Sequence, residues 1–143
     1  MTAIEPFAAV DVSELAAWLR TVPLADWPKM ADPDSLGAGN RIRAIADRLM
    51  IEFPGCSLSG VGLFLLAPGQ HHPPHEDIQP PNWVTRVHVP VVTNRHAIAI
   101  TPDGAIHMEA GVAYTFDTRA THAVRNDGSE PRVHMVFDVV RKP

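Results

Sequence analysis

The chain has 143 residues, of which 45% are apolar and 20% are charged, and this composition predicts one globular domain with a single core. Its net charge of −4 argues against non-specific binding to nucleic acid. The single cysteine, Cys56, excludes a disulfide framework and a cysteine-rich zinc site. No basic segment precedes an apolar run near the start, and no apolar run approaches the roughly 18 residues that span a membrane. We therefore expect a soluble, cytoplasmic protein.

The first part of the domain, residues 1–55, is expected to be mainly helical. The stretch DVSELAAWLRTV places apolar residues at helical spacing behind an N-cap at Asp11 or Ser13. A connector rich in proline and glycine follows over residues 25–39. The stretch NRIRAIADRLM, residues 40–50, then forms a second helix whose apolar side chains share one face. We expect these helices to cover one face of a β-sheet.

From Cys56 onward the pattern changes to short strands separated by turns. The sequence TPDG between two of them indicates a hairpin. The expected strands are CSLSGVGLFLLAPG, WVTRVHVPVVT, HAIAI, AIHMEA, GVAYTFD, THAVRN and RVHMVFDVV. Six or more such strands predict an antiparallel sandwich or jelly roll over residues 56–143, within a single domain of residues 1–143.

Two of these strands carry arginine and histidine on one face and apolar side chains on the other. Arg86 and His88 alternate with valines in VTRVHVPVV, and Arg132 and His134 alternate with apolar residues in RVHMVFDVV. A face turned to water would explain one such strand. The same pattern in two strands favours a polar pocket inside a small barrel, with the apolar faces packed under the helices.

The segment PPHED contains candidate metal ligands. Its two prolines favour an extended backbone, in which His75 and Asp77 point the same way. Both side chains can then reach one cation, and His122 in a late strand is the best candidate for a third ligand. Two histidines and one carboxylate on one side of a metal are the ligand set of non-haem Fe(II) oxygenases. Taken alone, His-x-Asp is also common in solvated turns.

In their order along the chain, these motifs resemble the aspartyl/asparaginyl β-hydroxylase family, whose bacterial relatives include hydroxylases of free amino acids. The resemblance covers about residues 60–140. It rests on a PG turn, PH-x-D, an R-x-H-x-P strand, E-x-G-x-x-x-x-F-D, a late H-x-V-x-N, and an arginine ten residues after that histidine. It implies a mainly β fold, the double-stranded β-helix or cupin-like jelly roll, with N-terminal covering helices.

The resemblance also implies an Fe(II)/2-oxoglutarate-dependent dioxygenase, with O2 and 2-oxoglutarate as co-substrates. The iron ligands that it implies are His75, Asp77 and His122. Asp77 is assigned as a ligand by its likeness to many bacterial members, which have this acid. The animal members look like two-histidine sites without it. Arg132 would pair with the distal carboxylate of 2-oxoglutarate, and Arg86 and His88 with its proximal end, because the planar fork of arginine matches a carboxylate. No other catalytic residue is implied.

The substrate is expected to be a small amino-acid-like molecule, because the chain is short and the pocket mouth carries groups suited to a zwitterion. The candidate substrate-binding residues are His72, Asn82, Arg125 and His134. Neither nucleic acid nor a membrane is an expected partner, and the sequence defines no oligomeric state. Two alternatives stay open: a metal-binding cupin of another class, against which Arg132 argues, and a non-catalytic module that binds a small acid.

Overall fold

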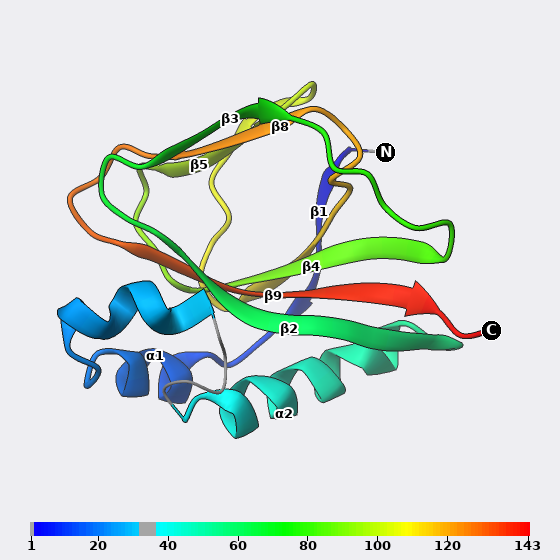
Figure 1. Ribbon diagram of the computed structural model, residues 1–143, viewed down its shortest axis with the longest axis horizontal. Helices are drawn as coiled ribbons and strands as arrows, with labels where there is room; N and C mark the ends of the chain where they lie inside the picture. Colours follow the sequence, from blue (N-terminus) through cyan, green and yellow to red (C-terminus); the bar gives the residue numbers. More distant parts are fainter. Residues whose placement is uncertain (1, 32–36) are drawn as a thin grey trace.

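The computed structural model describes residues 2–31 and 37–143, which fold into two antiparallel β-sheets that face one another (Figure 1). The larger sheet has the strand order β1-β7-β4-β9-β2, and the smaller sheet has the order β3-β8-β5-β6. Along the chain the elements are β1 (Ile4–Ala9), α1 (Ser13–Leu19), η1 (Leu24–Ala31), α2 (Gly39–Leu49), η2 (Met50–Glu52), β2 (Cys56–Leu66), β3 (His71–His75), β4 (Trp83–Val92), β5 (Ala97–Thr101), β6 (Gly104–Ile106), β7 (Val112–Phe116), β8 (His122–Asn126) and β9 (Arg132–Arg141). Strands distant in sequence are neighbours in each sheet, so the predicted jelly roll is confirmed.

The helices cover the face of the larger sheet that points away from the smaller sheet (Figure 1). Because α1 and α2 have only 7 and 11 residues, neither would be stable alone, and packing on the sheet supplies their stability. Ile42 and Ala46 of α2 are fully buried, as the helical spacing predicts. They share the main hydrophobic core with Val87 and Val89 of β4. The prediction of covering N-terminal helices is confirmed.

The N-terminal part contains more regular structure than its sequence pattern predicts. β1 lies where a helical or irregular segment is expected, and it pairs with β7 at the edge of the larger sheet. An edge strand tolerates Pro6, because a missing N–H on the open side breaks no ladder. The 3₁₀ helix η1 overlaps the first part of the expected connector, and its Trp27 and Met30 are buried. Residues 32–36 of that connector lie outside the described residues.

Three local features also differ from the expectation. Neither Asp11 nor Ser13 is the N-cap of α1; Val12 occupies that position, although the Asp11 Oδ1 atom accepts the N–H of Ser13 at 3.0 Å. The segment HHPPH forms β3, an exposed strand at the edge of the smaller sheet, where its prolines are tolerated. The second strand of the predicted hairpin, β6, has only 3 residues.

A buried asparagine connects the turn between β8 and β9 to the end of β2. Asn126 is 0% exposed, and its Nδ2 atom donates to the carbonyls of Leu66 at 3.0 Å and Glu130 at 2.8 Å. Its Oδ1 atom accepts the N–H of Gly128 at 3.0 Å and Nδ2 of Asn94 at 3.2 Å. The asparagine of the H-x-V-x-N motif thus fixes the place at which β9 begins.

The space between the two sheets holds a small apolar cluster and a polar pocket. The cluster consists of Ile4, Ala99, Met108, Tyr114 and Phe116. Phe116 also lines the pocket, so the cluster forms one of its walls. Within residues 2–31 and 37–143, no helix combines the length and the apolar character needed to cross a membrane.

Candidate metal and anion site

The pocket between the sheets has a volume of about 340 Å³ and receives side chains from both sheets. The smaller sheet and the loop after β3 contribute His75, Asp77 and His122, and the larger sheet contributes His88 and Arg132. A larger cavity of about 710 Å³ lies beside η1, but its wall is mostly apolar side chains and prolines. The polar pocket is therefore the candidate functional site.

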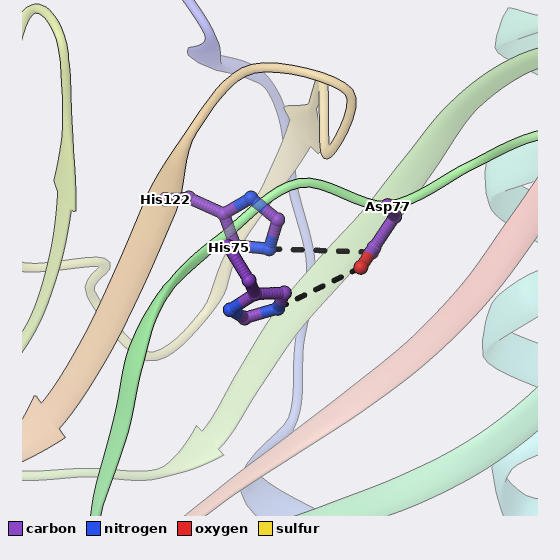
Figure 2. A group of neighbouring side chains, drawn as sticks. All are labelled: His75, Asp77 and His122. Atoms are coloured by element: carbon purple, nitrogen blue, oxygen red, sulfur yellow. Dashed lines mark ion pairs between the residues drawn. The ribbon is translucent and has the colours of Figure 1, made fainter.

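Two histidines and an aspartate converge at the pocket (Figure 2). His75 and His122 are paired residues of β3 and β8, and their ring centroids are 4.2 Å apart. Their Nε2 atoms lie 3.6 Å and 4.0 Å from the two carboxylate oxygens of Asp77. One ligand atom from each residue lies within 4.8 Å of the others, and the described residues contain no other such group. The three residues predicted from PPHED and THAV are thus brought together.

Backbone carbonyls fix both imidazole rings in the tautomer that a metal needs. The Nδ1 atom of His75 lies 2.8 Å from the carbonyl of Pro73, and Nδ1 of His122 lies 2.8 Å from the carbonyl of Ala120. A carbonyl can only accept, so each Nδ1 carries the proton and donates it. Each Nε2 then keeps a lone pair directed at Asp77. This arrangement of carbonyl, imidazole and free Nε2 is typical of metal-binding histidines.

Asp77 is held at its place by the backbone and by an arginine. Its N–H donates to the carbonyl of Thr118 at 2.9 Å, which ties the loop after β3 to the loop before β8. Its Oδ2 atom lies 3.3 Å from Nη1 of Arg86. The arginine and the backbone therefore hold this carboxylate in a fixed place beside the two imidazoles. His122 is buried, Asp77 is half-buried and His75 is exposed, so solvent can reach the site from one side.

Arg132 provides a buried positive charge at the inner wall of the pocket. Arg132 is 7% exposed, and its Nε atom has no hydrogen-bond partner among residues 2–31 and 37–143. In the part of the chain that the structure describes, no acidic side chain forms an ion pair with it. Burial lowers the pKa of Arg132 to about 10, so the group is still cationic at neutral pH. A buried cation without a counter-charge destabilises the fold, and a bound anionic ligand would supply that counter-charge.

Arg86 has two acidic partners. Its Nε and Nη2 atoms form a fork onto Asp138 at 2.9 Å and 3.1 Å, and its Nη1 atom contacts Asp77. The hydrogen bond to Asp138 is the main cause that raises the pKa of Arg86. Trp83 also donates its Nε1–H to Asp138 at 3.1 Å. Arg86 therefore links β9 to the carboxylate of Asp77. Its assignment to the proximal end of 2-oxoglutarate stays a prediction.

The predicted substrate-binding residues lie at different places. His72 lines the pocket, whereas His134 lies behind His88, with 3.0 Å between their Nδ1 atoms. Asn82 is exposed and is not part of the pocket wall. The Nε atom of Arg125 is 2.8 Å from Asp127, so its charge already has a partner. Of the four residues, only His72 faces the pocket directly.

Sequence reasoning missed several residues of the pocket wall. Phe64, Phe116, Thr118 and Val124 all line it. Phe116 could have been placed there, because it belongs to the quoted E-x-G-x-x-x-x-F-D motif and to a short alternating strand. Phe64 is 48% exposed in an apolar run without polar alternation, so no pattern marked which face it takes.

A jelly roll with a His-x-Asp and a distant His at one cation-sized site is the architecture of non-haem iron hydroxylases. A family model described as aspartyl/asparaginyl beta-hydroxylase matches residues 11–142. The chain belongs to this family, which comprises Fe(II)/2-oxoglutarate-dependent hydroxylases, and it is therefore an enzyme of that class. The predicted family is confirmed, and the match extends into the N-terminal helices that the resemblance left out. No curated protein sequence matches the chain.

Three solved structures with a similar fold are described as hydroxylases or as a monooxygenase. A viral collagen prolyl hydroxylase from Paramecium bursaria Chlorella virus 1, in complex with 2-oxoglutarate, has a TM-score of 0.67 at 13% identity, covering 99% of this chain and 97% of its own. A prolyl-4-hydroxylase from Pseudomonas putida has a TM-score of 0.63 at 18% identity, covering 99% and 94%. A nickel complex of the non-haem monooxygenase ThoJ has a TM-score of 0.64 at 18% identity, covering 97% and 74%. At these identities the likeness shows the fold.

Proposed function

We propose that this chain hydroxylates a small amino-acid-like substrate, with Fe(II) held by His75, Asp77 and His122 and with 2-oxoglutarate held by Arg132. The single observation that carries the proposal is the position of Arg132. A buried guanidinium, whose Nε atom finds no partner in the described part of the chain, lines the same pocket as the three candidate metal ligands. One molecule with a metal-binding end and a distal carboxylate would bind the metal at one end and pair with Arg132 at the other.

The donor set fits iron. Two neutral imidazoles and one carboxylate are borderline and hard ligands, and the described chain places no thiol among them, since Cys56 packs against the main core. Three ligands on one side leave positions for exogenous ligands. Iron bound there would supply the activation of O2. The overall reaction of the class converts substrate C–H, 2-oxoglutarate and O2 into substrate C–OH, succinate and CO2.

The residues of the chain bind, orient and shield in this reaction. Arg132 would hold the distal carboxylate in a place closed to solvent, where a charge-assisted hydrogen bond is strong. Phe116 and Val136 provide apolar walls around the pocket, which limit the access of water. Arg86 would hold the carboxylate of Asp77 in place through its Nη1 atom. Together these groups position the co-substrate next to the metal ligands and leave the outer part of the pocket for the substrate.

The size and lining of the pocket support a small substrate. The whole pocket has about 340 Å³, and 2-oxoglutarate would take up the part near Arg132. At the mouth, His72 and Phe64 offer one polar and one apolar contact. Arg125 supports the proposal less than the sequence pattern implied, because Asp127 already pairs with it, and Arg119 at the surface is likewise paired with Asp117. Recognition of the substrate's charged groups therefore falls mainly to His72 in this proposal.

Two experiments test the proposal in sequence. Anaerobic addition of Fe(II) and then 2-oxoglutarate should produce a visible charge-transfer band, which neither another class of cupin nor a non-catalytic acid-binding module would give. The iron-loaded enzyme is then incubated with 2-oxoglutarate, ascorbate and single free amino acids. Succinate above the uncoupled background, with a product heavier by one oxygen atom, is the expected result. Turnover confined to peptides, lipids or nucleosides would contradict the substrate class but not the cofactors.

A further inference from the structure

Two buried histidines form a hydrogen-bonded pair behind the candidate co-substrate site. His88 of β4 lines the pocket, and His134 of β9 lies behind it and is 1% exposed. Because His88 is opposite Val136 and His134 is opposite Pro90, the two histidines are diagonal neighbours on one face. Their Nδ1 atoms are 3.0 Å apart, and their rings are nearly perpendicular at 85°.

A contact between two Nδ1 atoms restricts the protonation of both rings. One nitrogen must donate and the other must accept, so the two rings cannot both be doubly protonated. Burial lowers the pKa of His88 and of His134 well below the usual value, and the charge of Arg132 lowers both further. Both rings are therefore neutral at pH 7. One must be the Nδ1–H tautomer and the other the Nε2–H tautomer, so each ring dictates the tautomer of its neighbour.

The chemistry of the pocket decides which ring donates. With Nδ1 of His88 engaged by His134, only its Nε2 atom is left to interact with a ligand. Arg132 marks this pocket as an anion site, and a carboxylate needs a hydrogen-bond donor. His88 can donate from Nε2 only if its Nδ1 atom accepts. The proton of the pair then belongs to Nδ1 of His134.

We propose that His134 is a positioning residue that donates its Nδ1–H to His88 and thereby fixes His88 as a neutral Nε2–H donor toward the bound carboxylate. The identity of that carboxylate as 2-oxoglutarate rests on the proposed function. His134 acts on the ligand through His88 and does not itself line the pocket. Without this partner, His88 could rotate its ring or change tautomer, and its Nε2 lone pair would then face the carboxylate and repel it.

The tautomers are measured by ¹⁵N NMR of the histidine side chains in the zinc-loaded protein, which is diamagnetic and does not turn over. We expect an Nδ1–H signal for His134 and an Nε2–H signal for His88, assigned by the loss of one set of signals in His134→Asn. His75 and His122 serve as internal references, because carbonyls fix both as Nδ1–H. The reverse tautomers in the pair would overturn the proposal.

The consequence for the ligand is measured with two variants of His134. Leucine fills the site without a donor, whereas the amide of asparagine can place an N–H close to the position of Nδ1. In His134→Leu we expect the Kd and KM for 2-oxoglutarate to rise by about 10- to 100-fold, the usual effect of losing a hydrogen bond to a charged group. The KM of the prime substrate should change little, and His134→Asn should recover most of the affinity.

Several outcomes separate this proposal from its alternatives. Equal affinity for 2-oxoglutarate in wild type and in folded His134→Leu overturns the positioning role. A similar loss in His134→Leu and His134→Asn overturns it too, because a merely structural role does not depend on the donor. If His134→Leu does not fold, the NMR tautomers and the affinity of His134→Asn decide. A wild-type protein that shows the expected tautomers but does not bind 2-oxoglutarate overturns the proposed function and leaves the tautomer pair standing.

Discussion

Replacing Arg132 by methionine should change the stability of the apoprotein and the affinity for 2-oxoglutarate in opposite directions. Arg132 is 7% exposed, and burial lowers its pKa from the usual range of arginine to about 10. At about 1.4 kcal/mol per pH unit, this shift corresponds to roughly 3 kcal/mol against the folded apoprotein. The cost is present in full at pH 7, where the group is charged in both the folded and the unfolded state. Methionine fills a similar volume without a charge, so the free energy of unfolding should stay equal or rise by up to about 3 kcal/mol.

The affinity for 2-oxoglutarate should fall at the same time. Removing one partner of a desolvated charge pair costs about 2–5 kcal/mol, which corresponds to a rise in Kd of roughly 30- to several-thousand-fold. Arg132→Lys should give an intermediate Kd, because lysine restores the charge but not the fork. The KM of the prime substrate should change much less, since Arg132 lies at the inner wall of the pocket.

Two measurements on the same variants check this pair of effects. Urea unfolding of the apoprotein gives the free energy of unfolding, and anaerobic calorimetric titration of the iron-loaded protein gives the Kd for 2-oxoglutarate. Arg119→Met is the matched control, because Arg119 is exposed and paired with Asp117. If Arg132→Met binds 2-oxoglutarate as tightly as wild type does, Arg132 is not the residue that holds its carboxylate. A clear loss of apoprotein stability would show that Arg132 has a stabilising partner in the folded chain, and the argument from its unpaired burial would fail.

Three further predictions concern the metal, acid stability and the turn before β9. His122→Ala should lower the iron content after anaerobic reconstitution, measured by metal analysis, because one of three protein ligands is lost. The pKa of His88 and of His134 is lowered in the folded state, so the unfolded chain binds more protons below about pH 6.5 and stability should fall there as pH decreases, by up to about 1.4 kcal/mol per pH unit for each ring. In urea unfolding at a series of pH values, the free energy of unfolding of His134→Leu should decrease less steeply with falling pH than that of wild type. Asn126→Ala should cost roughly 2–4 kcal/mol of stability, because the carbonyl of Leu66 and the N–H of Gly128 lose this side-chain partner, while the carbonyl of Glu130 keeps only its hydrogen bond from Asn94.

Matched controls accompany these predictions. His96→Ala changes an exposed turn histidine and should keep the iron content of wild type. Asn82→Ala changes an exposed asparagine and should leave the free energy of unfolding nearly unchanged. Iron content equal to wild type in His122→Ala would remove His122 from the ligand set. An acid dependence that is the same in wild type and in His134→Leu would mean that other groups cause it.

Strand alternation and motif spacing predicted the sheets and the convergence of His75, Asp77 and His122. They failed at β1 and β3, which both contain proline, because alternation and β-propensity are weak in edge strands that need pair on one side only. Contacts that depend on strand register could not be predicted from the sequence. The contact of His88 with His134 and the fork of Arg86 on Asp138 exist because β4 and β9 pair with one particular offset. Cytoplasmic location and the absence of nucleic-acid or membrane partners stay predictions.

The two halves of the site belong to different sheets, and this gives them unequal local stability. His75 and His122 lie on β3 and β8, in the sheet that none of the described helices covers, and β3 is exposed along its length. His88 and Arg132 lie on β4 and β9, inside the sheet that the helices cover. Segments with few buried contacts open most easily, so backbone amides of β3 should exchange with deuterium well before those of β9. A co-substrate that joins the metal to Arg132 would bridge both sheets, and its binding should slow exchange in β3 more than in β9.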